Sequence, residues 1–370
     1  MSNQTFETQC LPCTDEALSL GEALLRQGEI IGVPTETVYG LAADASNGEA
    51  IEKIYIAKGR PSFNPLIVHV GSSLNSCQKL AEQGLLDRDK ISEQAVELAN
   101  KLMRAFWPGP LTLVLPRGPT LSPMVARGLE TVGFRMPGHP DFLKFLDRSG
   151  LVLAAPSANR SNRISPTLVQ HVLAELSGRI PLVLDGGACQ VGLESTIVEI
   201  SGPSATIRLL RKGAIACEAL EAEAGVSLQA LPAGERLLAP GMMSKHYSPT
   251  KPLLLVHEDN LCLELQSLRQ SGVLAKISVL KFSDSPSLTM EKELQICGSP
   301  LELKYLPCND SLAAKILFQT LRMCDESDAQ IILVELPKQR LQSGLWPAIW
   351  DRLTRAGVRH LTDRPSDGST

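Results

Sequence analysis

The sequence predicts an α/β protein of two domains, each built on a sheet covered by helices. Short apolar runs of strand length alternate with stretches of helical periodicity along most of the chain. The 370 residues exceed the usual size of one domain and suit two. Residues 231–252 carry four prolines and no clear period, which is typical of a linker. We therefore predict domains at 1–230 and 253–370, joined by this linker.

The first region predicts a twisted, mixed sheet. Thr14 is a candidate cap for a helix that ends near Gly28. The other expected helices span residues 48–57, 91–106, 141–147 and 166–176. The expected strands span residues 29–33, 66–70, 111–115, 131–136, 151–155, 182–184, 195–200 and 206–210. Strands interleaved with helices in this way indicate an α/β domain.

The second region predicts a smaller, open α/β domain of the Rossmann-like kind. Its expected strands, 253–256, 277–280 and 331–334, are apolar throughout, as in a parallel sheet covered on both faces. Expected helices at 260–269, 311–323 and 346–356 alternate with them.

Composition and charge exclude several classes of function. Apolar residues at 44% and charged residues at 21% are globular values, so the chain can bury a core. A net charge of -4 gives no general attraction to nucleic acid or to an anionic membrane. The N-terminus lacks the basic and apolar regions of a secretion signal, and no apolar run reaches the roughly 18 residues of a membrane helix. We expect a cytoplasmic protein without membrane contact.

The cysteines predict reduced thiols. Their number, nine, is odd, and they are scattered along a large chain. Cys10 and Cys13 have C-x-x-C spacing, but no second pair or histidine nearby completes a set of zinc ligands. We therefore expect no metal held by protein side chains.

The segment PTETVYGLAAD, Pro34 to Asp44, suggests a site for an anionic substrate. It follows a strand and leads into a helix that stops beside Lys58 and Arg60. No Walker loop or Rossmann glycine turn occurs, so side chains would have to bind any phosphates. The helix dipole also favours cations at a helix C-terminus, so the pair fits either explanation. Asn64 and His69, directly after it, favour a binding site.

Arg135 lies among apolar residues on an expected strand, where an unpaired charge would be costly. It needs an anionic partner, either an internal carboxylate or a substrate carboxylate gripped by two hydrogen bonds. On the residues alone, the internal salt bridge is favoured.

Two further segments place polar groups beside strands. Ser157 and Asn159 follow an expected strand at its carboxyl end, where open α/β sheets bind ligands, although a simple Asx or Ser turn has the same pattern. Ser195 lacks the G-x-S-x-G context of a hydrolase nucleophile, and a hydrogen bond to substrate suits it better.

Taken in order, these segments resemble the YrdC-like family, and within it the long, two-domain threonylcarbamoyl-AMP synthases. The resemblance spans the first domain and the linker, and is looser in the second domain. It is carried by PTETVYGLAAD (34–44), KGRP (58–61), NPLIVHV (64–70), WPGPLTLVL (107–115), RMPGHP (135–140), APSAN (155–159), GLESTI (192–197), PGM (240–242) and KHYSP (245–249).

The resemblance implies an enzyme that combines L-threonine, bicarbonate and ATP into threonylcarbamoyl-AMP and releases pyrophosphate. Mg²⁺ would arrive on the ATP phosphates, and bicarbonate would be a co-substrate. The product would pass to a threonylcarbamoyl transferase complex that modifies tRNA, with weak direct tRNA contact as part of the same expectation.

The resemblance also implies site residues. Lys58 and Arg60 would be catalytic. ATP would contact Lys58, Arg60, Asn64, Thr131, Ser157, Asn159, Ser165, Arg211 and Tyr247. L-Threonine would contact Thr35, His69, Ser195, the backbone of Ala155, and Arg135, which would take the carboxylate. His246 and Tyr247 in the linker would form a lid that keeps water from a labile intermediate.

The chain departs from the family pattern at three places. Arg211-Lys212-Gly213 stands where Arg-Pro-Gly is usual, Met243-Ser244 replaces a basic and aromatic pair, and Asp351 replaces an asparagine. Two other functions stay open: an RNA-binding module, and a paralogue that transfers a carbamoyl group to another amine.

Overall fold

A computed structural model describes residues 6–202, 205–230, 246–270, 276–284, 301–337 and 341–357, with the backbone of 359–360. The chain forms two compact units, Met1–Ser161 with Ser165–Met243, and Asn162–Ile164 with Ser244–Thr370. Most of the predicted linker, residues 231–245 with the PGM segment and Met243-Ser244, lies outside the described residues. Its described end, 246–252, belongs to the second unit. The predicted domain boundaries stay a prediction.

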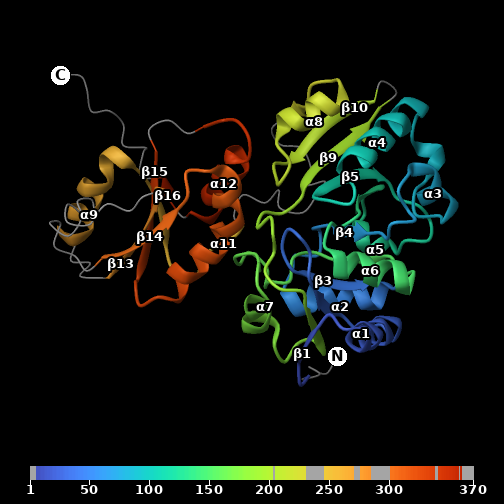
Figure 1. The fold of residues 1–370 in the computed structure, drawn as a ribbon, viewed down its shortest axis with the longest axis horizontal. Helices are drawn as coiled ribbons and strands as arrows, with labels where there is room; N and C mark the ends of the chain where they lie inside the picture. The colour runs from blue at the N-terminus through green and yellow to red at the C-terminus, as the bar shows by residue number, and fades with distance from the viewer. Residues whose placement is uncertain are drawn as a thin grey trace. The chain divides into compact units, whose positions relative to one another are not determined.

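The first unit is built on one mixed sheet, as predicted (Figure 1). Eleven strands of this sheet lie in the described part of the chain. The strand order is β1-β8-β2-β3-β7-β4-β6-β5-β9-β10-β11. The strands are β1 (Gln9–Pro12), β2 (Ile31–Val33), β3 (Gly40–Asp44), β4 (Ile67–His69), β5 (Leu111–Pro116), β6 (Thr131–Arg135), β7 (Leu153–Ala154), β8 (Leu182–Asp185), β9 (Thr196–Ser201), β10 (Thr206–Arg211) and β11 (Gln229–Ala230).

Helices cover this sheet because its strands are apolar on both faces. Successive side chains of a strand point to opposite faces, and along β3 Leu41 and Ala43 join one core cluster while Ala42 joins another. The second cluster includes Phe142 and Phe145 of α6. The helices of this unit are α1 (Asp15–Arg26), α2 (Gly48–Lys58), α3 (Cys77–Glu82), α4 (Glu93–Phe106), α5 (Pro123–Ala126), α6 (Pro140–Ser149), α7 (Val169–Leu176) and α8 (Cys217–Ala224), with the 3₁₀ turn η1 (Arg88–Lys90).

Local sequence sets the ends of the helix that leads to the site. The Asn47 side chain accepts hydrogen bonds from the backbone N–H groups of Glu49 and Ala50, which caps the start of α2. Gly59 ends the helix in the left-handed conformation, with φ of 59°. The chain therefore turns sharply between Lys58 and Arg60.

The described part of the second unit contains a five-stranded parallel sheet of order β14-β13-β15-β12-β16 (Figure 1). Helices alternate with most of its strands along the chain. Its strands are β12 (Leu253–His257), β13 (Ile277–Phe282), β14 (Leu301–Leu306), β15 (Ile331–Leu336) and β16 (Arg359–His360). Its helices are α9 (Leu261–Gln270), α11 (Asp310–Glu326) and α12 (Trp346–Ala356), with the 3₁₀ turn η2 (Glu258–Asn260). The prediction of a small open α/β domain is confirmed.

Several elements escaped the sequence analysis. β3 is made of small residues, GLAAD, which have low strand propensity, yet it is buried between β2 and β7. β1 and β14 pair along one side only, and β14 carries charges, LELKYL. Helices such as α3 and α5 are too short to show a period. Tertiary packing, rather than local pattern, stabilises these elements.

We expect Phe134→Ala to destabilise the first unit by about 3–5 kcal/mol, because Phe134 is fully buried on central strand β6. Urea unfolding followed by circular dichroism measures the change. Phe63→Ala is the matched control, since this side chain is 53% exposed, and should change stability by less than about 0.5 kcal/mol. Similar losses for both variants would contradict the assigned core.

Candidate active site

Strand ends converge at one edge of the eleven-stranded sheet. β4 runs parallel to β6, which places His69 opposite Arg135 at their carboxyl ends. β5 runs antiparallel to β6 and parallel to β9, so the first residues of β5 and β9 lie beside the end of β6. Arg211 ends β10 opposite Ile197, and Ser195 directly precedes β9. Polar residues from distant parts of the sequence therefore meet at this edge.

Lys58 joins two of the predicted motifs. Its ammonium is buried and donates hydrogen bonds to the carbonyl oxygens of Ser157, at 2.5 Å, and Asn159. Burial, and then the neighbouring Arg60, lower the pKa of Lys58 well below its ordinary value, while Glu175 raises it. The end of α2 is thus tied to the segment after β7.

Arg60 lies beside Lys58 and is turned toward the backbone of the next segment. Its Nε donates to the carbonyl oxygen of Asn64 at 3.3 Å, and Nη2 donates to that of Pro65 at 2.9 Å. Burial lowers the pKa of Arg60 to about 10, with Tyr55 acting in the opposite direction and Arg211 adding to the lowering. The guanidinium stays charged at neutral pH.

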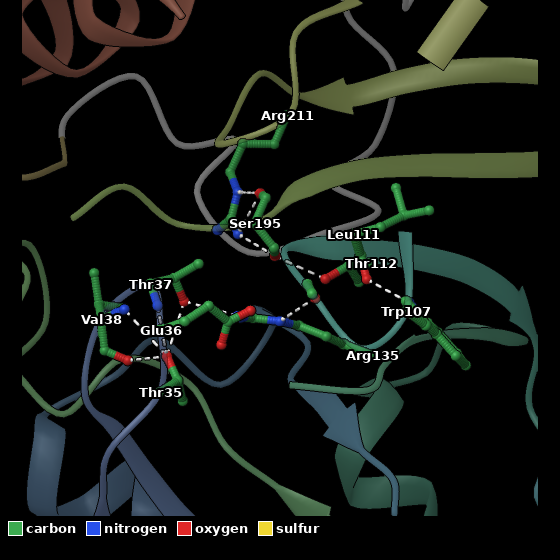
Figure 2. A network of polar contacts seen from close by, with 11 residues as sticks. Thr35, Glu36, Thr37, Val38, Trp107, Leu111, Thr112, Arg135, Ser195 and Arg211 are labelled. Atoms are coloured by element: carbon green, nitrogen blue, oxygen red, sulfur yellow. Dashed lines mark hydrogen bonds and ion pairs between the residues drawn. The ribbon is translucent and has the colours of Figure 1, made fainter. Parts of the chain in front are cut away.

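Arg211 holds Ser195 in place. Nε and Nη2 donate to the Ser195 carbonyl oxygen at 3.1 and 2.9 Å, and Nη2 also donates to Oγ at 3.0 Å. The Ser195 and Thr112 hydroxyls are 2.7 Å apart. Figure 2 shows this chain of contacts running from β10 to β5.

Gly213, in the Arg211-Lys212-Gly213 segment, packs closely on the backbone before β9. A Cβ at this position would lie 2.4 Å from the Ser195 carbonyl carbon and from the Thr196 nitrogen. The glycine lets the chain after β10 pack directly on the backbone of the GLESTI segment, and this chain keeps it.

Arg135 has an internal carboxylate partner. Nη2 donates to Glu36 Oε1 at 2.6 Å and to Thr37 Oγ1 at 3.0 Å, and Nε donates to the Gly109 carbonyl oxygen at 3.2 Å (Figure 2). This is the internal salt bridge that the residue pattern alone favoured. Recognition of a substrate carboxylate by Arg135 stays a prediction.

Thr35 lies in the same network through the turn that follows it. Its hydroxyl donates to the Val38 carbonyl oxygen at 2.6 Å and accepts from the backbone N–H groups of Thr37 and Val38. The Thr35 side chain therefore fixes the conformation of the PTET segment beside Arg135.

His69 is an uncharged member of the site. Burial, and then Arg135, lower the pKa of His69 to about 3, so the imidazole is neutral at physiological pH. Its Nδ1 is buried without a hydrogen-bond partner among the residues described. The backbone N–H of Ala155 donates to the Ile67 carbonyl oxygen at 2.9 Å, which holds Ala155 near β4.

Two buried glutamates at the site were not predicted from the sequence. Glu36 pairs with Arg135, and Glu194 accepts a 2.5 Å hydrogen bond from the hydroxyl of Ser165. Both glutamates lie inside motifs that were identified, PTET and GLEST. Glu36 could have been found from the sequence, because a buried Arg135 needs an anionic partner. No feature of the sequence pointed to Glu194.

Thr131 lies apart from the other predicted residues. It begins β6, so the strand separates it from Arg135 by about 13 Å. It lines a cavity of about 490 Å³ together with Asp89 and Glu199. Its assignment to ATP stays a prediction.

His246 and Tyr247 belong to the second unit. The Tyr247 ring is fully buried, stacks on Phe318 at 5.6 Å, and meets the His246 ring edge at 4.0 Å. Arg352 lies over the Tyr247 ring at 5.1 Å. The role of both residues as a lid stays a prediction.

The substitution to Asp351 acquires a structural role here. Its two carboxylate oxygens accept hydrogen bonds from Arg352 Nη1 at 3.0 Å and Arg355 Nε at 2.9 Å. Because an aspartate carries a charge that asparagine lacks, it offsets the charge of buried Arg352.

The paired cysteines Cys10 and Cys13 are not activated. Burial raises the pKa of Cys13 to about 12, with Asp141 and Asp185 adding to the effect, and burial also raises that of Cys10. In the described part of the chain, no three histidine, cysteine, aspartate or glutamate side chains are grouped to hold a metal ion. None of the described helices has the length and apolar character needed to cross a membrane.

Comparison with known proteins gives consistent matches along the chain. Residues 23–213 match the family profile described as Telomere recombination, and residues 212–357 match the Threonylcarbamoyl-AMP synthase C-terminal domain. The threonylcarbamoyl-AMP synthase of Bacillus subtilis is 38% identical over 356 residues, which is 94% of this chain and 95% of the relative. That of Pyrococcus abyssi is 33% identical over 349 residues, 92% of this chain and 93% of the relative.

A solved structure is similar over the same extent. The crystal structure of P. abyssi Sua5 complexed with L-threonine matches with a TM-score of 0.77 and 32% identity, covering 95% of this chain and 97% of that chain. Together with the two profiles, these matches show that the chain belongs to the threonylcarbamoyl-AMP synthase family, in its two-domain form.

Proposed function

We propose that this protein forms threonylcarbamoyl-AMP and pyrophosphate from L-threonine, bicarbonate and ATP. One observation carries the proposal: the cations Lys58, Arg60 and Arg211 gather at the sheet edge that also holds Arg135 and neutral His69. Such an edge can bind a polyphosphate and an amino acid side by side. The family relationship supports the same activity.

The cations suit the phosphate chemistry. The amine of threonine and bicarbonate give a carbamate and water, and a carbamate oxygen then attacks the α-phosphate of ATP while pyrophosphate leaves. Negative charge then grows on the departing pyrophosphate, and fixed cations offset it without reorganising. Mg²⁺ enters with the ATP phosphates as part of the substrate. Asn64, Ser157, Asn159 and Ser165 are the proposed hydrogen-bonding partners of the nucleotide.

The second half of the site suits the amino acid. Arg135 would hold the threonine carboxylate, with Thr35, Ser195 and the Ala155 backbone around it. A neutral His69 can share a hydrogen bond with the substrate hydroxyl without adding charge. The similar P. abyssi structure was determined with L-threonine, which supports this assignment.

The wider role follows from the proposed product. We propose that the protein works in the cytoplasm and delivers threonylcarbamoyl-AMP to a transferase complex that modifies tRNA, with at most a weak direct contact to tRNA. Neither an RNA-binding module nor transfer to another amine is favoured, because the relatives that match over nearly their full length are named for threonylcarbamoyl-AMP synthesis.

Arg60→Ala should abolish threonine-dependent pyrophosphate release, because it removes a fixed cation from the phosphate site. A coupled pyrophosphate assay with ATP and bicarbonate, with and without L-threonine, measures this. Arg104→Ala, at an exposed position on α4, is the control and should keep full activity. Release by the unaltered protein that does not depend on threonine would sink the proposed function, and near-normal turnover by Arg60→Ala would refute the role of Arg60.

ATP affinity should fall as pH rises, well before an ordinary lysine would titrate. Burial and Arg60 lower the pKa of Lys58, so its ammonium loses the proton, and the charge, below the ordinary value of 10.5. Calorimetric titration with Mg-ATP from pH 7 to 9, where Arg60 stays charged, measures the effect in the absence of threonine. Lys58→Arg keeps its charge throughout and should remove the fall. An equal fall in both proteins would assign it to another group.

A further inference from the structure

We propose that Glu36 is the receptor for the ammonium group of the amino-acid substrate, and that with Arg135 it forms a paired site for the zwitterion. The inference rests on the proposed function and adds to it a specificity-determining residue in the PTET segment. Neither the motif pattern nor the family resemblance assigned Glu36 a role.

The carboxylate of Glu36 is incompletely satisfied by the residues that the structure describes. Oε1 accepts the hydrogen bond from Arg135 Nη2 at 2.6 Å, but Oε2 is buried with no hydrogen-bond partner among the described residues. Figure 2 shows this second oxygen outside the dashed contacts. A buried carboxylate oxygen without a donor is costly, and a ligand N–H group is the natural means of satisfying it.

Arg135 likewise keeps a hydrogen-bond donor that is not paired with a group of the described residues. Its Nε and Nη2 donate to protein groups, whereas no hydrogen bond from Nη1 to another described residue is formed. The Glu36–Arg135 pair therefore keeps one acceptor and one donor at adjacent positions. An α-amino acid carries an ammonium and a carboxylate on one carbon, so its two charges are spaced to meet such a pair.

Glu36 is better suited to bind the ammonium group than the neighbouring polar side chains. His69 is neutral and carries no charge to offer a cation. The Thr35 hydroxyl already donates to Val38 and accepts from two backbone N–H groups. Lys58, Arg60 and Arg211 are cations and would repel an ammonium. Glu194, the other buried carboxylate noted at the site, accepts from Ser165.

The test compares two ligands that differ only in the amine. Calorimetric titration measures binding of L-threonine and of (R)-3-hydroxybutyrate, which is threonine without its amino group, to the full-length protein and to Glu36→Gln. The glutamine keeps an oxygen to accept from Arg135 but loses the charge. We expect Glu36→Gln to weaken threonine binding about 10- to 100-fold, as for loss of a hydrogen bond between charged groups, and to leave (R)-3-hydroxybutyrate binding unchanged.

The matched control is Glu199→Gln. Glu199 is also buried and accepts from an arginine, Arg208 Nε, at 2.7 Å, so the substitution removes a similar ion pair elsewhere in the unit. It should leave threonine binding unchanged.

Three outcomes overturn the inference. Equal weakening of both ligands by Glu36→Gln would mean that Glu36 only orients Arg135, and no weakening of either would mean that the ammonium binds elsewhere. In both cases threonine-dependent pyrophosphate release by the unaltered protein leaves the proposed function standing. Failure of the unaltered protein to bind threonine would remove both together.

Discussion

The buried ammonium of Lys58 is the constraint on which the rest of the site depends. A charge in this position must be hydrogen-bonded, and the acceptors are two carbonyl oxygens of the segment after β7. Backbone pairing holds this segment beside β3: β7 pairs with β3, the Leu41 N–H donates to the Pro156 carbonyl oxygen, and the Ala158 N–H donates to that of Tyr39. The end of α2 and the APSAN segment are therefore held together around a single charge, with β3 paired beside them.

The two halves of the site balance their charges differently. Lys58 and Arg60 donate to neutral carbonyl oxygens, so their positive charge remains to act on a ligand. Arg135 is instead paired with Glu36, which makes that half nearly neutral. A strongly anionic group suits the first half, and a molecule bearing both charges suits the second. Under the proposed function, the first half would bind the nucleotide and the second half the amino acid.

Sequence reasoning recovered the long strands and helices and most residues of the edge where the strands converge. It succeeded where the chemistry was local: a cation beside a helix end, an arginine in an apolar strand, an amide after a strand. It failed where a partner came from far along the chain. The pairing of Arg135 with Glu36 spans 99 residues, and that of Ser165 with Glu194 spans 29. β3 was missed because its small residues are strand-forming only once β2 and β7 flank them.

The order of strands also governs how this unit can assemble. β2 pairs with β8, whose residues come about 150 positions later, and β5 pairs with β9 across more than 80. Such long-range contacts form only after large loops have closed, and loop closure loses chain entropy before any apolar surface is buried. Folding of this unit is therefore expected to be slow. On the ribosome, β2 would emerge with the side away from β3 unpaired until Leu182–Asp185 of β8 follow. Arg211 is the last of the three cations to be synthesised, so a nascent chain gains the complete group of Lys58, Arg60 and Arg211 only when nearly all of the first unit has been made, and shorter products lack it.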